Sequence, residues 1–218
     1  MSDSFSARRQ LFQSALFQDQ VADRLELDRG LVYPAINAML QADMIPCRLS
    51  RNHKALATDG AMILAAIGGR QSLAASIVRV GCAVCAMNMQ HEIGAPQRGS
   101  GADMFPTSAS FSFGTDVAEV LLNLWRISRG SSTKGFKGVT IGIYWSDVLG
   151  STLFGAIEQP SLGRKRTYAT QALPAPPGGG DWEFIQMSAV GGTLYSPMSI
   201  LRFGALLDTS VEETAAAI

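Results

Sequence analysis

The sequence predicts an α+β protein with a helical N-terminal half and a β-rich C-terminal half. In the first half, apolar residues such as Leu11 and Ala15 recur at the spacing of an amphipathic helix. After Gly130, short β-branched and aromatic runs alternate with turns rich in Gly, Ser and Pro, which is typical of strands. A chain of 218 residues forms one large domain or two small ones.

Six helices are predicted from the apolar spacing. In chain order they are residues 4–17, 18–25, 31–42, 59–67, 72–89 and 115–128. We expect Asp28 to cap the third helix and Pro34 to lie in its first turn, where a missing N–H costs nothing. The helix 72–89 is apolar almost all round, which predicts that it is buried. Residues 45–57 are expected to be irregular or extended.

The C-terminal half contains four strand candidates. They are residues 139–145, 153–158, 167–172 and 182–188. The stretch 173–180, LPAPPGGG, is expected to be a loop or linker. Residues 199–207 fit a helix or a strand, and the tail begins like a capped helix, with Glu213 three residues after Ser210.

An internal boundary is expected in the Gly- and Pro-containing loop 94–110. The loop divides a helical region, residues 1–98, from a mixed region with Gly/Pro-rich connectors, residues 99–218. Neither region carries a strong net charge: residues 1–98 have ten basic and eight acidic residues, and residues 99–218 have eight and ten. This balance argues against a strongly basic nucleic-acid-binding domain.

Charged residues are unusually few, at 17% of the chain against about 25% in an average domain. A subunit that buries much of its surface against copies of itself needs fewer charges, because such interfaces resemble a divided core. The start of the chain lacks an apolar signal segment, and no apolar stretch is long enough to span a membrane. Three cysteines, an odd number, indicate a reducing compartment, so a cytoplasmic location is expected, or a virion location if the chain is a coat protein.

These observations favour a self-assembling structural subunit, such as a viral coat or capsid-type protein, which is not an enzyme. Its expected partners are copies of itself and, through local basic patches, RNA or DNA. No cofactor is predicted. The basic residues expected to contact nucleic acid are Arg8, Arg9, Arg48, Arg51, Lys54, Arg164, Lys165 and Arg166. The candidate interface anchors are Trp125, Trp145 and Trp182, for which burial in the core is the alternative.

One segment suggests a different function. Residues 20–45, QVADRLELDRGLVYPAINAMLQADMI, resemble the helix-turn-helix of winged-helix regulators of the PadR type. The run from Lys54 to Gly60 is similar to the strand-to-helix junction that follows the wing in that family. The resemblance implies a DNA-binding transcriptional regulator with a C-terminal dimerisation or effector domain. It implies that the helix from Gly30 reads DNA through Arg29, Tyr33 and Asn37; the alternative is a packing corner at 18–60.

The cysteines raise the question of a metal site. Cys82 and Cys85 have the two-residue spacing of metal and redox motifs, and Cys47 with either His53 or His91 could complete a zinc site. The alternative is that both are core residues, since cysteines in an apolar stretch behave as small hydrophobes. The chain contains no phosphate-loop, nucleophile-elbow or paired-histidine motif, so no catalytic residue is predicted from sequence.

Overall fold

The computed structural model describes residue 12 and residues 14–46, 52–94, 103–107, 112–130, 138–146, 152–171 and 191–216. In chain order its elements are α2 (Ala15–Leu25), α3 (Arg29–Gln41), α4 (His53–Gly68), α5 (Ala74–Cys85), β1 (Asn88–Ile93), α6 (Phe113–Arg129), β2 (Thr140–Ser146), β3 (Thr152–Gln159), the 3-10 turn η1 (Pro160–Leu162), β4 (Arg164–Ala169), β5 (Gly191–Tyr195) and α8 (Pro197–Ala216). The predicted α+β class is confirmed.

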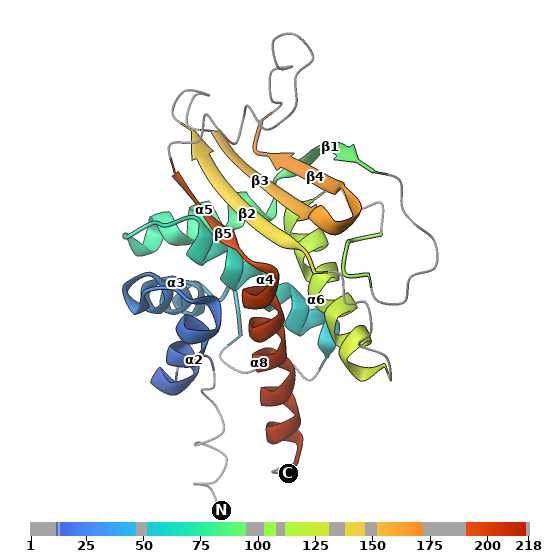
Figure 1. Ribbon diagram of the computed structural model, residues 1–218. Coiled ribbons are helices and arrows are strands. Elements are labelled where there is room, and N and C mark those ends of the chain that lie inside the picture. Colours follow the sequence, from blue (N-terminus) through green and yellow to red (C-terminus); the bar gives the residue numbers. More distant parts are fainter. Residues whose placement is uncertain are drawn as a thin grey trace, which may run out of the picture.

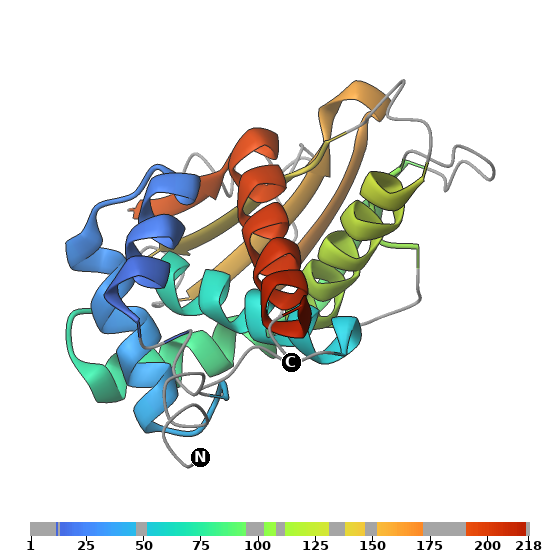
Figure 2. The ribbon, with the colours of Figure 1, turned by 90° about the horizontal axis from the view of Figure 1, so that it is seen from below.

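The strands of the described ranges form one antiparallel sheet in the order β1-β4-β3-β2-β5. Strands β2, β3 and β4 follow one another as a meander, while β1 and β5 form the two edges. In Figure 1 the sheet lies at the top and the helices lie below it. Figure 2 looks onto the helices, with α8 between the α2–α3 pair and α6, and with the sheet behind them.

One hydrophobic core lies between the helices and the sheet, with α4 at its centre. Ile143 of β2 and Tyr195 of β5 are 0% and 1% exposed, and the Tyr195 hydroxyl donates to the Leu64 carbonyl at 2.7 Å. Gly68 ends α4 against the sheet: a Cβ there would lie 2.4 Å from Ile143 Cδ1 and 3.2 Å from Ile143 Cβ, so a larger residue would require Ile143 or the helix to shift. The centre of the fold is therefore a closely packed helix-on-sheet contact.

Both sides of the predicted boundary at residues 98 and 99 contribute to this core. Helix α2 packs on α8, and α4 packs on α6. Strand β1, from the first region, pairs with β4 of the second, with Glu92 opposite Arg166. The two regions thus share one core in the part of the chain that the structure describes.

The N-terminal helices confirm some of the predicted signals and correct others. Asp28 caps α3 as expected, because its Oδ1 accepts from the Gly30 N–H at 2.6 Å. Pro34, however, lies inside α3 and not in its first turn, since the helix already begins at Arg29. The predicted break between residues 17 and 18 is wrong: α2 starts after Ser14, whose side chain accepts from the Phe17 N–H, and continues unbroken to Leu25.

Helices α4 and α5 also differ from the prediction. The segment 45–57 was expected to be irregular, but α4 begins at His53 because Asn52 Oδ1 accepts from the Lys54 N–H at 2.9 Å. The predicted helix 72–89 ends at Cys85 and is followed by β1. Its predicted full burial is wrong, because the buried residues of α5 are three: Ile77, Gly81 and Val84.

In the C-terminal half, the predicted strands 139–145 and 153–158 are confirmed as β2 and β3. The candidate strand 167–172 is β4, which starts three residues earlier than expected, at Arg164. Residues 199–207 are helical and belong to α8, which continues without a break through the predicted separate tail helix. The candidate strand 182–188 and the linker 173–180 lie outside the described residues.

Candidate functional site

The residues expected to read DNA lie on α3 and are bound by side chains of α2. The Arg29 guanidinium donates to Asp19. The Tyr33 hydroxyl donates to the same carboxylate at 2.7 Å, and this bond, followed by that of Arg29, lowers the pKa of Asp19. Asn37 accepts from the Gln18 side chain at 2.9 Å. All three side chains thus have partners on the neighbouring helix.

The run from Lys54 to Gly60, which resembles the strand-to-helix junction of that family, lies entirely inside α4. A further carboxylate, that of Asp23, lies 3.6 Å from Arg29 Nη2. The surface around Arg29 therefore carries two acidic groups beside its one guanidinium. A site that contacts phosphates benefits from unopposed positive charge, so the local electrostatics do not favour DNA binding by this helix.

Of the expected nucleic-acid contacts, Arg8, Arg9, Arg48 and Arg51 lie outside the described residues. Lys54 is exposed in the first turn of α4. Lys165 lies on β4, and its Nζ is 3.0 Å from Glu158 Oε1 on the neighbouring strand β3. The described lysines of the prediction therefore belong to different layers of the molecule.

The expectation of an exposed basic run at residues 164–166 is wrong for its two arginines. Arg164 and Arg166 are only 2% and 4% exposed. Arg164 Nη1 lies 2.5 Å from Asp103 Oδ2, and its guanidinium carbon lies 4.2 Å from the centre of the Phe105 ring. The other Asp103 oxygen accepts from the Phe105 N–H and from the Gln159 side chain, each at 2.9 Å. Arg164 thus attaches the segment 103–107 to the sheet.

Arg166 forms a second buried cluster with α6 and β1. Its Nη1 lies 2.8 Å from Asp116 Oδ2, and its Nε lies 3.2 Å from Glu92 Oε1. Tyr168, two residues along β4, donates its hydroxyl to the same Asp116 carboxylate. Burial, followed by the negative charge of Asp116, raises the pKa of Tyr168 and keeps it a hydrogen-bond donor. The cluster binds α6 to the sheet and leaves these charges no surface for a polyanion.

The tryptophans differ in position. Trp125 is 3% exposed and donates from Nε1 to the Gly204 carbonyl at 2.9 Å, which joins α6 to α8. It is a core residue of this chain, so its expected role as an interface anchor is wrong. Trp145 is half-buried on β2, and Trp182 lies outside the described residues.

The candidate metal ligands do not gather in one place. The Cys85 thiol, at the end of α5, donates toward Met62 Sδ at 3.8 Å, and burial raises its pKa to about 12. It therefore stays protonated and is a poor metal ligand at neutral pH. Cys82 lies one turn earlier, His91 is exposed on β1, and Cys47 is outside the described residues. Across the described ranges, no three Cys, His, Asp or Glu side chains are close enough to hold a metal ion.

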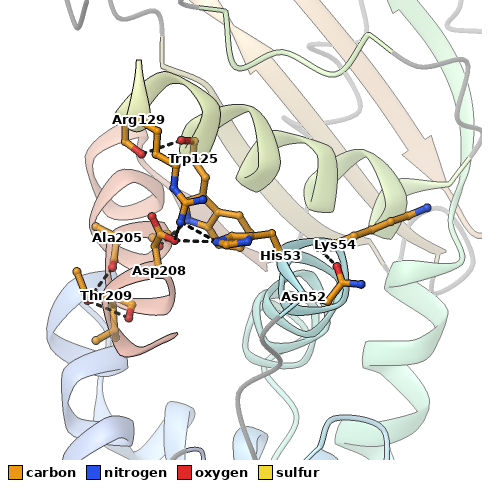
Figure 3. A network of polar contacts seen from close by, with 11 residues as sticks. Asn52, His53, Lys54, Trp125, Arg129, Ala205, Asp208 and Thr209 are labelled. Atoms are coloured by element: carbon orange, nitrogen blue, oxygen red, sulfur yellow. Dashed lines mark hydrogen bonds and ion pairs between the residues drawn. The ribbon is translucent and has the colours of Figure 1, made fainter. Parts of the chain in front are cut away.

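A polar cluster that the sequence did not indicate joins three helices (Figure 3). His53 Nε2, at the start of α4, lies 3.0 Å from Asp208 Oδ1 of α8. Arg129, at the end of α6, donates to the same oxygen at 2.8 Å and lies 2.9 Å from His53 Nε2. The imidazole also packs edge-on against Trp125, with ring centres 5.2 Å apart.

The His53–Asp208–Arg129 cluster joins the start of α4 and the end of α6 to the middle of α8. The His53 Nε2 atom donates to Asp208 in one tautomer and accepts from Arg129 in the other, so the imidazole has a partner in both. Among the described residues, no hydroxyl or thiol is a hydrogen-bond partner of His53, so the cluster lacks a nucleophile for a catalytic triad. We interpret it as an interhelical clasp.

Asp59 of α4 gives a testable pH dependence. Its Oδ2 is buried without a hydrogen-bond partner, and burial raises the pKa of the carboxyl to about 6. Because the folded pKa lies above the unfolded value of 3.8, stability should fall as the pH rises from about 4 to 6. Asp59→Asn should therefore raise the free energy of unfolding by about 1 kcal/mol at pH 8, a value reduced for partial exposure. Urea unfolding at pH 3.5 should show no gain in stability for Asp59→Asn. An equal gain at pH 3.5 and pH 8 would contradict a raised pKa of Asp59.

Strand β5 lies at an edge of the sheet that the described strands form. In the described part of the chain it pairs with β2 alone, with Leu194 opposite Gly142. Thr193 and Tyr195 point into the core, with 3% and 1% exposure, whereas Leu194 between them is 63% exposed. Alternation therefore places Leu194 on the face of the sheet opposite the helices.

Comparison with family models, with curated proteins and with solved structures found no match for this chain. None of the helices within the described ranges is both long enough and apolar enough to cross a membrane.

Proposed function

We propose that this chain is a self-assembling structural subunit, of the coat or capsid type, whose copies associate through the β5 edge of the sheet. The observation that carries the proposal is the position of β5 at an edge of the sheet of described strands, with Leu194 63% exposed. Exposed main-chain N–H and C=O groups at such an edge pair readily with a second strand. Antiparallel pairing of two copies of β5 would continue the sheet from one subunit into the next.

The two sheet edges differ in how well they suit this role. Natural monomers protect an edge with charged residues, proline or a bulge. Strand β5, GGTLY, has neither charge nor proline. Strand β1, NMQHEI, carries Glu92 and has a register shift between Met89 and His91. The β5 edge is therefore the better surface for association.

A shell or lattice also requires contacts beyond a single edge, because one two-fold contact makes only a dimer. Other large apolar side chains are exposed on different elements. They include Leu16 on α2, Leu73 before α5 and Met198 at the start of α8, with 69%, 70% and 51% exposure. Together with a charged share of only 17%, these residues support additional apolar contacts between copies.

The experiment compares the assembly of the wild-type chain with that of Leu194→Lys. Multi-angle light scattering over a range of concentrations should show large wild-type assemblies, which negative-stain microscopy should resolve as particles. The lysine places a charge at the edge, so the concentration needed for assembly should rise at least about tenfold. Ile93→Lys is the matched control, because it places the same charge at a 39% exposed site on the other edge strand, β1.

Two outcomes would contradict the proposal. The first is a wild-type chain that stays monomeric at high concentration, and the second is a Leu194→Lys chain that assembles like the wild type. The helix-turn-helix hypothesis remains a separate prediction. A discrete dimer that binds duplex DNA with a steep salt dependence, weakened by Arg29→Ala and Tyr33→Ala, would support it in place of a structural subunit.

A further inference from the structure

A groove of about 610 Å³ lies between α4 and α6, beside the end of α5. This volume is within the range of small-molecule sites. Its floor is formed by apolar and weakly polar side chains, namely Ala61, Met62, Cys85, Ala118 and Leu122. Cys85 belongs to this apolar surface because burial keeps its thiol protonated.

One end of the groove is closed by direct contact between α5 and α6. A Cβ on Gly114 would lie 2.9 Å from Cys85 Cβ and 3.1 Å from the Cys85 carbonyl oxygen. The backbones of the two helices therefore touch here, and glycine is needed for the approach. The tail of a small molecule that lies along the groove can end at this contact.

The polar groups along the walls already have partners within the chain. The Thr58 hydroxyl donates to the Lys54 carbonyl at 3.0 Å, and the Ser112 and Thr115 hydroxyls bond each other at 2.7 Å. Glu119 Oε1 accepts from the Thr107 N–H at 2.8 Å and from its hydroxyl at 2.9 Å. The middle of the groove therefore suits an apolar chain better than a polar one.

Two cations lie at the other end. Lys54 is eight residues before Met62 on α4, or about 12 Å along the helix, and Arg126 lies three turns beyond Gly114 on α6. Figure 3 shows Lys54 extending from α4 on the side away from His53. Both cations are exposed, and in the described part of the chain neither has a carboxylate within 4.0 Å. The groove thus has an apolar closed end and a positively charged open end.

We propose that this groove binds a single-chain amphipathic anion, a monocarboxylate with a medium-length apolar tail. The tail would lie on Met62, Ala118 and Leu122, and the carboxylate would lie between Lys54 and Arg126. The charge complementarity at the open end and the closure at Gly114 argue for this occupant. No residue of β5 lines the groove, so the proposal is independent of self-assembly.

Isothermal titration calorimetry with decanoate tests the site, with decanol and decyltrimethylammonium as comparison probes. Wild-type protein should bind decanoate at least tenfold more tightly than either comparison probe. The double variant Lys54→Gln/Arg126→Gln should lose at least tenfold in decanoate affinity but keep its decanol affinity. The matched control is Arg24→Gln/Arg79→Gln, which removes two exposed cations from α2 and α5 and should bind like the wild type.

A second variant tests the apolar part of the site. Leu122→Trp should fill the groove and abolish the binding of both decanoate and decanol, and thermal unfolding followed by circular dichroism verifies that each variant is folded. Equal affinity for decanoate and decyltrimethylammonium, or unchanged decanoate affinity in the Lys54→Gln/Arg126→Gln variant, would overturn the proposal. Binding of an acidic amphipathic peptide without binding of decanoate would overturn it as well.

Discussion

Asp116→Asn is expected to lower the free energy of unfolding by about 3 kcal/mol, because it leaves a buried guanidinium without its closest carboxylate. Asp116 is 0% exposed, and it accepts from Arg166 Nη1 at 2.8 Å and from the Tyr168 hydroxyl. Glu92, 3.2 Å from Arg166 Nε, compensates only in part because it is itself partly exposed. Urea unfolding at neutral pH measures the loss.

The control for this prediction is Asp23→Asn, which makes the same change at an exposed pair. Asp23 lies 3.6 Å from Arg29 with 69% of its side chain exposed, so the cost should stay below about 0.5 kcal/mol. Replacing both partners, in Asp116→Asn/Arg166→Met, should cost less than the sum of the single changes, since no charge is left unpaired. A loss below about 1 kcal/mol for Asp116→Asn would show that the buried pair is unimportant for stability.

Phe113→Ala is expected to lower the free energy of unfolding by about 3 to 5 kcal/mol. Phe113 begins α6, is 2% exposed, and lies edge-on to Tyr168 with ring centres 5.1 Å apart. Its ring fills the space over Gly155 of β3, where a Cβ would lie 2.8 Å from Phe113 Cε2. Removing the ring leaves a cavity between α6 and the sheet that the rigid strands cannot close.

A size exchange tests the same contact from the side of the strand. Gly155→Ala alone should be destabilising, because its Cβ would also lie 2.8 Å from Met87 Cε. Combined with Phe113→Ala, it should cost less than the sum of the two changes. Leu16→Ala, at a 69% exposed site, should change stability by less than about 0.5 kcal/mol. Additive losses in chemical denaturation would contradict direct packing of Phe113 on Gly155.

The proposed substitutions affect folding stability and self-assembly at different places in the molecule. Asp116 and Phe113 act where α6 meets β4 and β3, whereas Leu194 lies on β5 at the far edge of the sheet from β1. Leu194→Lys should therefore change association with little effect on unfolding. Asp116→Asn should lower the free energy of unfolding but leave association unchanged at temperatures where the chain remains folded.

The side of the groove formed by α6 could be predicted from the sequence. Thr115, Ala118, Leu122 and Arg126 recur at helical spacing within a segment that was predicted to be a helix. The pattern does not reveal which helix lies opposite, and the facing residues come from α4 and the end of α5. The clasp between His53 and Asp208 joins residues 155 positions apart, a separation that no local pattern records.

The sequence by itself determined the elements whose signals are local. The α+β class, the Asp28 cap and the alternation that marks β2 and β3 all depend on residues a few positions apart, within the reach of a helical turn or a strand pleat. These features would be present in almost any arrangement of the same segments.

The tertiary structure alone decided that the two arginines of the basic run at the start of β4 are buried. In the sequence, Arg164 and Arg166 have the pattern of exposed charges. The fold brings Asp103 and Asp116 to them from 61 and 50 residues away, and each guanidinium is buried against a carboxylate. A charge can be buried without a large cost only when such a partner is present. Which carboxylate lies beside each arginine depends on the packing of the whole molecule.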